Sequence, residues 1–392
     1  MDVDKSIRSN IGRYYLATSL SAFAFYTPII QLFYLVHGLT VFKIAILGVV
    51  WTVTRMILEV PSSVLADKWG RKRVMMISTI FTILQLITLI YSREYIFFVL
   101  ASVWSAGAFA FLSGVDVAFF YDTLKSLKME ANFDKLWAKQ QIYQQIPFTI
   151  AFLASGVLFN ISPSLPFKLS LLFMIPSAIM IAMLTEPKFH KPVEEVKPLA
   201  NFKQSVQLIF NNQHLKFILL FTLIFSLGSD YSYGYGQVYL NQMSMPVVLF
   251  GVVFVFKSFL CTVSANAVSP LRKKISDRGL FGFQIIAVAV LLFIMVATNN
   301  FVVGAFCFAL TAIPYGFFEI SKSSYMHRQI ESHRRATVGS LISFFVAVMF
   351  LILEPIFGRL ADGYSIKLPF LIIAVIMSVY SVYYLSWGHK KV

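Results

Sequence analysis

The segment 64–73 constrains the fold of this chain more than any other part of the sequence. It reads VLADKWGRKR, which places one acid, four cations and a glycine between two long apolar runs. A turn this short joins two membrane spans at one face of the bilayer. Because Lys and Arg beside span ends stay on the cytoplasmic side, the segment also predicts which face that is.

The composition fits a membrane protein and excludes several other classes. Hydrophobic residues make up 58% of the 392 positions and charged residues 13%, against about 45–50% and about 25% in soluble domains. The net charge of +15 does not indicate a nucleic-acid partner, because the cations lie in short loops and not on a basic domain. Cys261 and Cys307 lie in apolar runs, so no metal, cofactor or disulfide framework is expected.

Twelve apolar windows are long enough to span a bilayer, which needs about 20 residues. The fourth and seventh windows each contain one acid, Asp116 and Asp230. The sequence therefore predicts an all-α polytopic membrane protein with spans at 13–36, 41–64, 74–92, 95–121, 140–160, 167–185, 217–240, 247–271, 280–298, 301–326, 337–358 and 366–387.

The distribution of Lys and Arg sets the expected orientation. With the N-terminus inside, 25 of these cations fall in cytoplasmic segments, five in outer loops and three within spans. Both termini are therefore expected in the cytoplasm. The compact loops and many Phe residues favour a prokaryotic inner membrane.

A polar segment divides the chain into two six-span halves, residues 1–185 and 217–392. The segment between them, 186–216, begins Pro-rich and ends with apolar residues at helical spacing from Leu199 to Ile209. We expect a cytoplasmic linker with a short amphipathic helix, either on the membrane surface or packed against the span ends.

An internal repeat supports this division. Glu59 precedes Leu-Ala-Asp at 65–67, and Glu354 precedes Leu-Ala-Asp at 360–362 with the same spacing. The first copy runs from outside to inside and the second from inside to outside. Inverted repeats of three spans within each half would produce this opposition.

Together, the twelve spans, the central polar segment and the 63–73 loop resemble the major facilitator superfamily. The signature of that family between spans two and three is G-x-L-A-D-[RK]-x-G-R-[KR]. Matching positions in this chain are Leu65, Ala66, Asp67, Lys68, Gly70, Arg71 and Lys72, while Ser63 stands in place of the first Gly. A looser second copy occupies 271–279.

The resemblance implies a secondary transporter that works by alternating access. It further implies that Asp67, Arg71 and Asp122 form a charge network that locks the cytoplasmic ends of the spans. The alternative is a cluster of cations that only sets topology. The predicted cytoplasmic gate comprises Asp67, Lys68, Gly70, Arg71, Lys72 and Asp122.

Ionisable residues within spans are costly and are functional candidates by default. Lys257 has only apolar residues three and four positions away. We expect it to pair with Asp230, which lies at a similar depth, with Glu319 or Glu354 as the alternative partner. The pair could be static or could respond to protons and substrate.

The other intramembrane charges fall into two kinds. Arg55 with Glu59, and Glu319 with Lys322, have the spacing of neighbours on one helix face and can neutralise each other. By contrast, Asp116 has no cation at these spacings. A lone carboxyl group can carry a proton, so Asp116 is the first candidate for proton coupling, followed by Asp230 and Glu319.

Span seven contains an unusual cluster of Tyr, Gly and Gln. It suggests a substrate cavity, because Tyr and Gln offer hydrogen bonds to a ligand. The alternative is that the glycines permit close helix packing and the tyrosines lie at the membrane interface. The cavity candidates are Tyr26, Gln31, Tyr231, Tyr233, Tyr235 and Gln237.

The expected function is proton-coupled export of small lipophilic, drug-like molecules, because the cavity residues are aromatic and apolar with few acids. The chain resembles the bacterial drug/proton antiporter branch, although 101–107 lacks the Arg that such antiporters carry in span four. Uptake or facilitated diffusion of a metabolite is the alternative, and a non-transporting sensor or scaffold is a third possibility. No catalytic or ATP-binding motif is present, so no enzyme is expected. The expected partners are a small molecule, protons and lipid, with the protein as a monomer.

Overall fold

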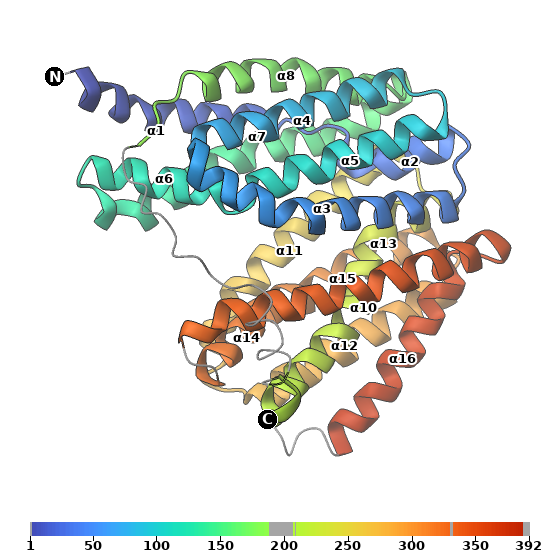
Figure 1. Cartoon of the computed structure of the whole chain (residues 1–392). Helices are drawn as coiled ribbons and strands as arrows, with labels where there is room; N and C mark the ends of the chain where they lie inside the picture. Colours follow the sequence, from blue (N-terminus) through green and yellow to red (C-terminus); the bar gives the residue numbers. More distant parts are fainter. Residues whose placement is uncertain (1, 188–206, 208, 330–331, 387–392) are drawn as a thin grey trace. The chain divides into compact units, whose positions relative to one another are not determined.

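The computed structural model describes residues 2–187, 207, 209–329 and 332–386, and the predicted all-α membrane fold is confirmed for them. Eleven helical segments are long and apolar enough to cross a membrane, and the shorter apolar segment Thr27–Val36 belongs to the first predicted span. Within the described ranges every regular element is helical (Figure 1). The predicted amphipathic helix lies outside the described residues, except for positions 207 and 209.

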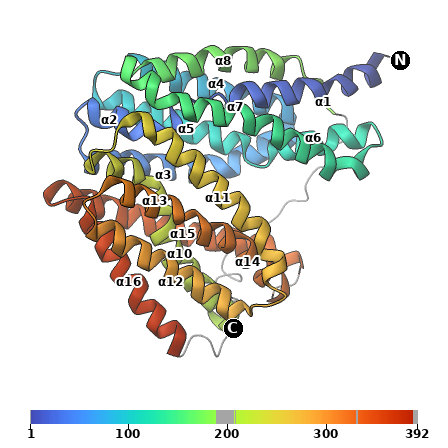
Figure 2. The ribbon, with the colours of Figure 1, turned by 180° about the vertical axis from the view of Figure 1, so that it is seen from behind.

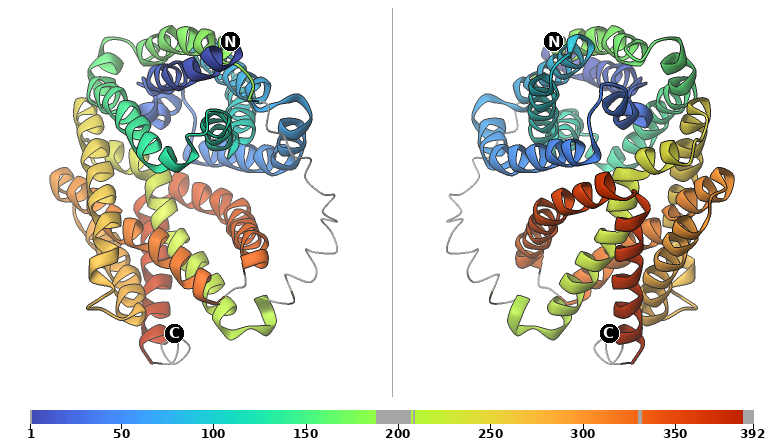
Figure 3. Two further views of the ribbon diagram at one scale, coloured as in Figure 1. Left: turned by 90° about the vertical axis from the view of Figure 1, so that its left-hand side faces the viewer. Right: turned by 90° about the vertical axis from the view of Figure 1, so that its right-hand side faces the viewer.

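The chain separates into two compact units. The N-terminal unit comprises Met1–Leu39 and Ile46–Glu195. Several of its helices are seen nearly end-on in Figure 3, which displays them as a bundle. They are α1 (Asp2–Ser21), α2 (Ile30–Val36), α3 (Val41–Trp69), α4 (Arg71–Tyr91), α5 (Tyr95–Leu112), α6 (Val115–Ser126), α7 (Phe133–Ile161) and α8 (Leu165–Ala182), with short 3-10 turns at Thr27–Ile29 and Glu130–Asn132.

Two predicted spans of this unit are broken helices. The first span is interrupted between α1 and α2, where Pro28 cannot donate a backbone hydrogen bond. The fourth is interrupted at Ser113 and Gly114, and Gly114 has a φ of +75°. Such a left-handed backbone favours glycine, so the break is specified by the sequence.

The C-terminal unit comprises Thr40–Ala45 and Val196–Val392. Its helices are α10 (Gln213–Gln242), α11 (Phe250–Leu271), α12 (Asp277–Ala297), α13 (Phe301–Leu310), α14 (Ala312–Gln329), α15 (Ser332–Gly363) and α16 (Lys367–Ser386). α11 and α14 pack side by side, as do α12 and α16 (Figure 2).

α10 is the central helix of the C-terminal unit. Its apolar window is 72% buried, more than that of any other candidate span in the described chain. A Cβ at Gly228 would lie 2.2 Å from the Met377 sulfur, and one at Gly236 would lie 2.3 Å from the Phe308 ring. These two glycines therefore allow close helix packing, whereas a Cβ at Gly234 would meet nothing within 4 Å.

The second copy of the Leu-Ala-Asp repeat has a defined contact. Asp362 accepts hydrogen bonds from the backbone N–H groups of Val41 at 2.7 Å and Phe42 at 3.0 Å. Val41 and Phe42 belong to the segment Thr40–Ala45 of the C-terminal unit, so the carboxylate caps a helix start within its own unit, where unpaired N–H groups favour negative charge. Its counterpart in the first copy, Asp67, is exposed and has no hydrogen bond or ion pair to the described residues.

Candidate functional site

The loop after α3 builds a charge cluster in the N-terminal unit. Gly70 has a φ of +93°, which ends α3 and starts α4 at Arg71. The guanidinium of Arg71 donates hydrogen bonds to the carboxylate of Asp122 and to the carbonyl oxygen of Ala118, both on α6. The loop therefore connects the start of α4 to the middle of α6 through a charge-assisted bond.

A second carboxylate completes this Arg71 cluster. Glu186 accepts hydrogen bonds from the backbone N–H groups of Arg71 and Lys72, both at 2.8 Å. It thereby caps the N-terminus of α4, where two otherwise unpaired donors meet a negative charge. The predicted gate residues Lys68 and Asp67 are exposed and lie outside this cluster, so the structure unites Arg71 with Asp122 and leaves Asp67 apart.

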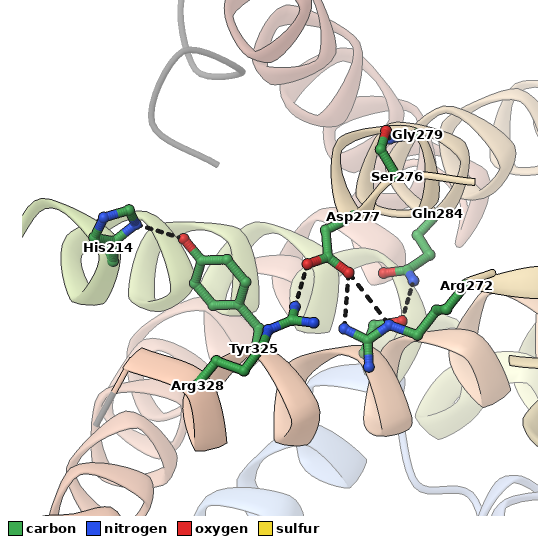
Figure 4. Close-up of polar contacts among 9 residues, drawn as sticks. His214, Arg272, Ser276, Asp277, Gly279, Gln284, Tyr325 and Arg328 are labelled. Atoms are coloured by element: carbon green, nitrogen blue, oxygen red, sulfur yellow. Dashed lines mark hydrogen bonds and ion pairs between the residues drawn. The ribbon is translucent and has the colours of Figure 1, made fainter. Parts of the chain in front are cut away.

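The C-terminal unit has a corresponding cluster in which the central residue is an acid and not a base (Figure 4). Asp277, the first residue of α12, accepts hydrogen bonds from Arg272 at 2.7 Å and from Arg328 at the end of α14. Arg71 likewise opens α4 and meets Asp122, which lies in the second half of α6. The positions of acid and base are exchanged between the two units.

Neighbouring contacts in Figure 4 tie the same ends of the helices together. His214 on α10 lies 2.8 Å, ring nitrogen to hydroxyl oxygen, from Tyr325 on α14. Gln284 on α12 donates to the hydroxyl of Ser321 at 3.3 Å. Ser276 accepts from the N–H of Gly279 at 3.2 Å and caps α12.

The intramembrane charges of the N-terminal unit are locally compensated. Arg55 pairs with Glu59 at 3.7 Å, and its guanidinium lies 4.6 Å from the centre of the Phe109 ring. Asp116 lies in the first turn of α6 and accepts a hydrogen bond from the N–H of Val117 at 2.8 Å. The break before α6 thus gives Asp116 a helix-end environment that the sequence pattern did not predict.

The predicted ion pair between Lys257 and Asp230 is absent from the described part of the chain. Lys257 is 8% exposed and donates from Nζ to the carbonyl oxygen of Phe308 at 3.0 Å and to the hydroxyl of Thr311. It pairs with neither Glu319 nor Glu354 among these residues. The reason is rotational, because this face of α11 points to α13 while Asp230 lies on α10 beside residues of α14.

The Phe308 carbonyl lies in the last turn of α13, which ends at Leu310 before α14 starts at Ala312. Pro314 has no N–H to donate to the carbonyl four residues earlier, that of Leu310, so the regular bonding of the span is interrupted close to this point. The last carbonyls of a helix carry partial negative charge and attract cations. Lys257 therefore places its ammonium group at the end of α13, with the Phe308 ring centre 4.1 Å away.

The remaining charges of the C-terminal unit form what we name the midspan charged face. Its members lie near the middle of α10 and α14. Glu319 and Lys322 form an ion pair of 2.8 Å, and Asp230 lies within electrostatic range of both. Tyr315 interacts with Asp230 and Glu319 in the same way. The midspan charged face consists of Asp230, Tyr233, Tyr315, Glu319 and Lys322.

The predicted cavity residues divide into exposed and buried sets. Tyr233 is 53% exposed, whereas Tyr231 and Tyr235 are 1% and 4% exposed and stack on each other at 4.5 Å. Gln237 is also buried. In the N-terminal unit Tyr26 stacks on Phe167 at 5.6 Å, and Gln31 is partly buried. Of the three tyrosines predicted on α10, only Tyr233 lies on an open face.

Several contributors were missed from the sequence. Glu186 was assigned to the linker, and Arg328 and Thr311 were not singled out. The second copy of the loop motif at 271–279 pointed to Asp277, and a search for the nearest cation at the end of span ten would have found Arg328. No group of three or more metal-ligating side chains occurs among the described residues.

Comparison with known proteins identifies the family. The sequence model of the Major Facilitator Superfamily matches residues 14–353, and the chain belongs to this family. The Bacillus subtilis (strain 168) protein YxaM, an uncharacterized MFS-type transporter, is 21% identical over 369 residues, which cover 93% of this chain and 92% of that protein. This chain is therefore a polytopic membrane transporter of that superfamily.

Solved structures share the fold at low sequence identity. A mutant of the nucleoside transporter NupG superposes with a TM-score of 0.80 and 13% identity, covering 96% of this chain and 99% of that one. A POT family transporter in complex with a peptide conjugate gives 0.72 and 10%, covering 97% and 96%. A bacterial homolog of the human lysosomal transporter Spinster gives 0.70 and 13%, covering 97% and 95%.

Proposed function

We propose that this protein is a proton-coupled secondary transporter that exports small lipophilic molecules by alternating access. Asp230 is the coupling carboxylate in this proposal, in place of Asp116. The substrate contacts the midspan charged face of the C-terminal unit, with Tyr233 and Tyr315 as its aromatic surface. The Arg71 and Asp277 clusters hold the ends of the spans that have to move.

The observation that carries the proposal is the environment of Asp230. It lies in the middle of α10, the most buried span, and forms no ion pair with the described residues. Ser226, one turn away on the same helix, hydrogen bonds with its carboxylate. A carboxyl group at this depth faces protein or a water-filled space, where loading and release of a proton changes its charge.

Asp116 is a weaker coupling candidate for a structural reason. Its carboxylate accepts a hydrogen bond from the backbone of its own turn, at the N-terminal end of α6. Both interactions stabilise the ionised form in every conformation that keeps α6 intact. A coupling group has to change protonation during the cycle, and Asp230 has fewer fixed partners that oppose this change.

Uptake or facilitated diffusion of a polar metabolite is the second candidate. The Glu319–Lys322 pair and the tyrosine hydroxyls of the midspan charged face favour it, since they can hydrogen bond a polar solute. The similarity in fold to the nucleoside transporter NupG is compatible with this alternative. Direction and coupling separate the two candidates.

Transport into proteoliposomes tests the proposal directly. Wild-type protein, Asp230→Asn and Asp116→Asn are compared with fluorescent lipophilic dyes of positive, zero and negative charge, with and without an imposed pH gradient. We expect gradient-driven movement in wild type and Asp116→Asn, reversal when the gradient is reversed, and loss in Asp230→Asn. Movement that ignores the gradient would establish a facilitator, and loss in Asp116→Asn alone would move coupling to Asp116.

A further inference from the structure

Lys257 differs from the other two cations within the spans of this chain. Arg55 has Glu59 and Lys322 has Glu319 as a carboxylate partner. Among the described residues Lys257 has none, and the titratable groups beside it are the thiol of Cys261 and the phenol of Tyr233, neither of which is a carboxylate. Two of the three intramembrane cations are thus paired within one helix, and the third is not.

The partners that Lys257 does have are neutral. Its ammonium group donates to the Phe308 carbonyl and the Thr311 hydroxyl, which accounts for two of its three N–H donors. The partial charge at the end of α13 and the Phe308 ring at 4.1 Å reduce the cost of burial. Neither supplies a full negative charge, and a buried ammonium without a counter-charge is expensive.

Tyr233 is an exposed side chain beside Lys257. The Tyr233 ring centre lies 5.9 Å from Nζ, and this ring also meets Phe254 edge-on at 6.1 Å. Tyr233 is 53% exposed, while Phe254 and Phe308 are buried. A ligand on the midspan charged face would therefore reach the ammonium group by displacing one half-exposed aromatic side chain.

We propose that Lys257 binds the anionic group of the substrate, and that the substrate is an aromatic or otherwise lipophilic organic anion such as a carboxylate. This inference rests on the proposed transport function and names its substrate class. The anion supplies the counter-charge that the protein does not provide, and the rings of Tyr233, Phe254 and Phe308 suit an apolar body. It narrows the small lipophilic substrate expected from the sequence to an organic anion.

Asp230 is not a competing explanation for Lys257. The electrostatic partners of Asp230 are Glu319 and Lys322, so its nearest cation is already part of the midspan charged face. An organic anion bound at Lys257 would be separated from that carboxylate by Tyr233, one turn further along α10. Selection for the anion thus arises from the unpaired ammonium and not from the net charge of the face.

Ligand-induced stabilisation of the purified protein tests the assignment without any gradient. The probes are 2-naphthoate, the uncharged 2-naphthamide and the cationic 2-naphthylmethylammonium, added to wild type, Lys257→Gln, Lys257→Arg and Lys216→Gln. Lys216 is an exposed cation on α10 and provides the matched loss of charge. We expect only naphthoate to raise the melting temperature saturably in wild type, Lys257→Arg and Lys216→Gln.

In Lys257→Gln the apparent affinity for naphthoate should fall by about tenfold or more, as for loss of a charged hydrogen bond. Equal affinity in this variant would overturn the assignment, as would a wild-type protein that prefers naphthamide or the ammonium probe or responds to none. If Lys257→Gln fails to fold, the three probes on wild type and Lys257→Arg still decide. Because no pH gradient is used, failure of proton coupling at Asp230 leaves this result unaffected.

Discussion

One added methyl group at Gly316 tests how tightly α11 and α14 are held together. A Cβ there would lie 2.1 Å from the Ser264 hydroxyl oxygen and 2.6 Å from the Cys261 carbonyl oxygen. The hydroxyl can rotate away, but the carbonyl moves only with the backbone of α11. That contact must lengthen from 2.6 Å to at least 3.4 Å, so Gly316→Ala forces the two helices apart.

The size of the effect follows from two opposing terms. Overpacking of a tight interface costs about 1–3 kcal/mol, and replacing Gly by Ala within a helix returns about 0.5–1 kcal/mol. The difference between these ranges is about 0–2.5 kcal/mol, so we expect Gly316→Ala to destabilise the protein by about 1 kcal/mol. Gly234→Ala is the matched control, because its Cβ meets nothing within 4 Å and only the helix term applies.

The measurement is the melting temperature of purified protein in detergent, followed by intrinsic fluorescence. Gly316→Ala should melt below wild type, by about 2–4 °C per kcal/mol for a unit of this size, and Gly234→Ala at or above it. Transport should also fall in Gly316→Ala, since Lys257 lies on α11 and Glu319 on α14. If both variants melt alike, α11 and α14 do not approach as closely as described.

Three further changes address the loop clusters. Gly70→Ala combines a φ of +93° with a Cβ 2.8 Å from the Glu186 carboxyl carbon, so it should lower the melting temperature clearly, while Gly12→Ala, which meets nothing within 4 Å, should not. Glu186→Gln keeps the shape but removes the charge at the start of α4, and we expect a loss of about 0.3–1 kcal/mol in the unfolding free energy; a variant as stable as wild type would contradict the cap. Asp277→Asn leaves Arg272 and Arg328 facing each other, so its deficit in melting temperature should shrink as salt is raised from low ionic strength; a salt-independent deficit would refute this electrostatic origin.

Features that depend on local sequence could be predicted well. Span positions follow from hydropathy, and the pairs Arg55–Glu59 and Glu319–Lys322 follow from helical spacing. The Arg71–Asp122 ion pair was predicted from the loop motif and is present. Each of these needs only the knowledge that a segment is helical or where a helix ends.

Features that depend on helix rotation and helix breaks could not be predicted. Tyr231, Tyr233 and Tyr235 are close in sequence, yet only the side chain of Tyr233 is exposed, because packing of α10 against its neighbours fixes which face is open. The partner of Lys257 is the end of α13, which exists only because the span is interrupted near Pro314. Asp230 was expected as the partner only because it lies at a similar depth in the membrane. Depth does not determine which way a side chain points from its helix.

The two loop clusters join the first residue of one helix to a later helix with opposite signs, which suggests that acid and base could be exchanged within either pair. We predict that the exchange fails in both units. Arg71 also donates to the carbonyl oxygen of Ala118, and an acid in its place would face that oxygen. Asp277 also accepts from Arg272, and a base in its place would face a second cation.

The double variants Arg71→Asp/Asp122→Arg and Asp277→Arg/Arg328→Asp should therefore melt no higher at low salt than their single variants. Adding Arg272→Gln to the second double variant removes the opposing cation and should restore part of the lost stability, whereas the Ala118 carbonyl cannot be removed in this way. Full recovery in either double variant would mean that the third partner contributes nothing. In each cluster a neighbour of fixed polarity thus determines whether the first residue of the helix is an acid or a base. Both units have an ion pair at the start of a helix, but acid and base are exchanged between them.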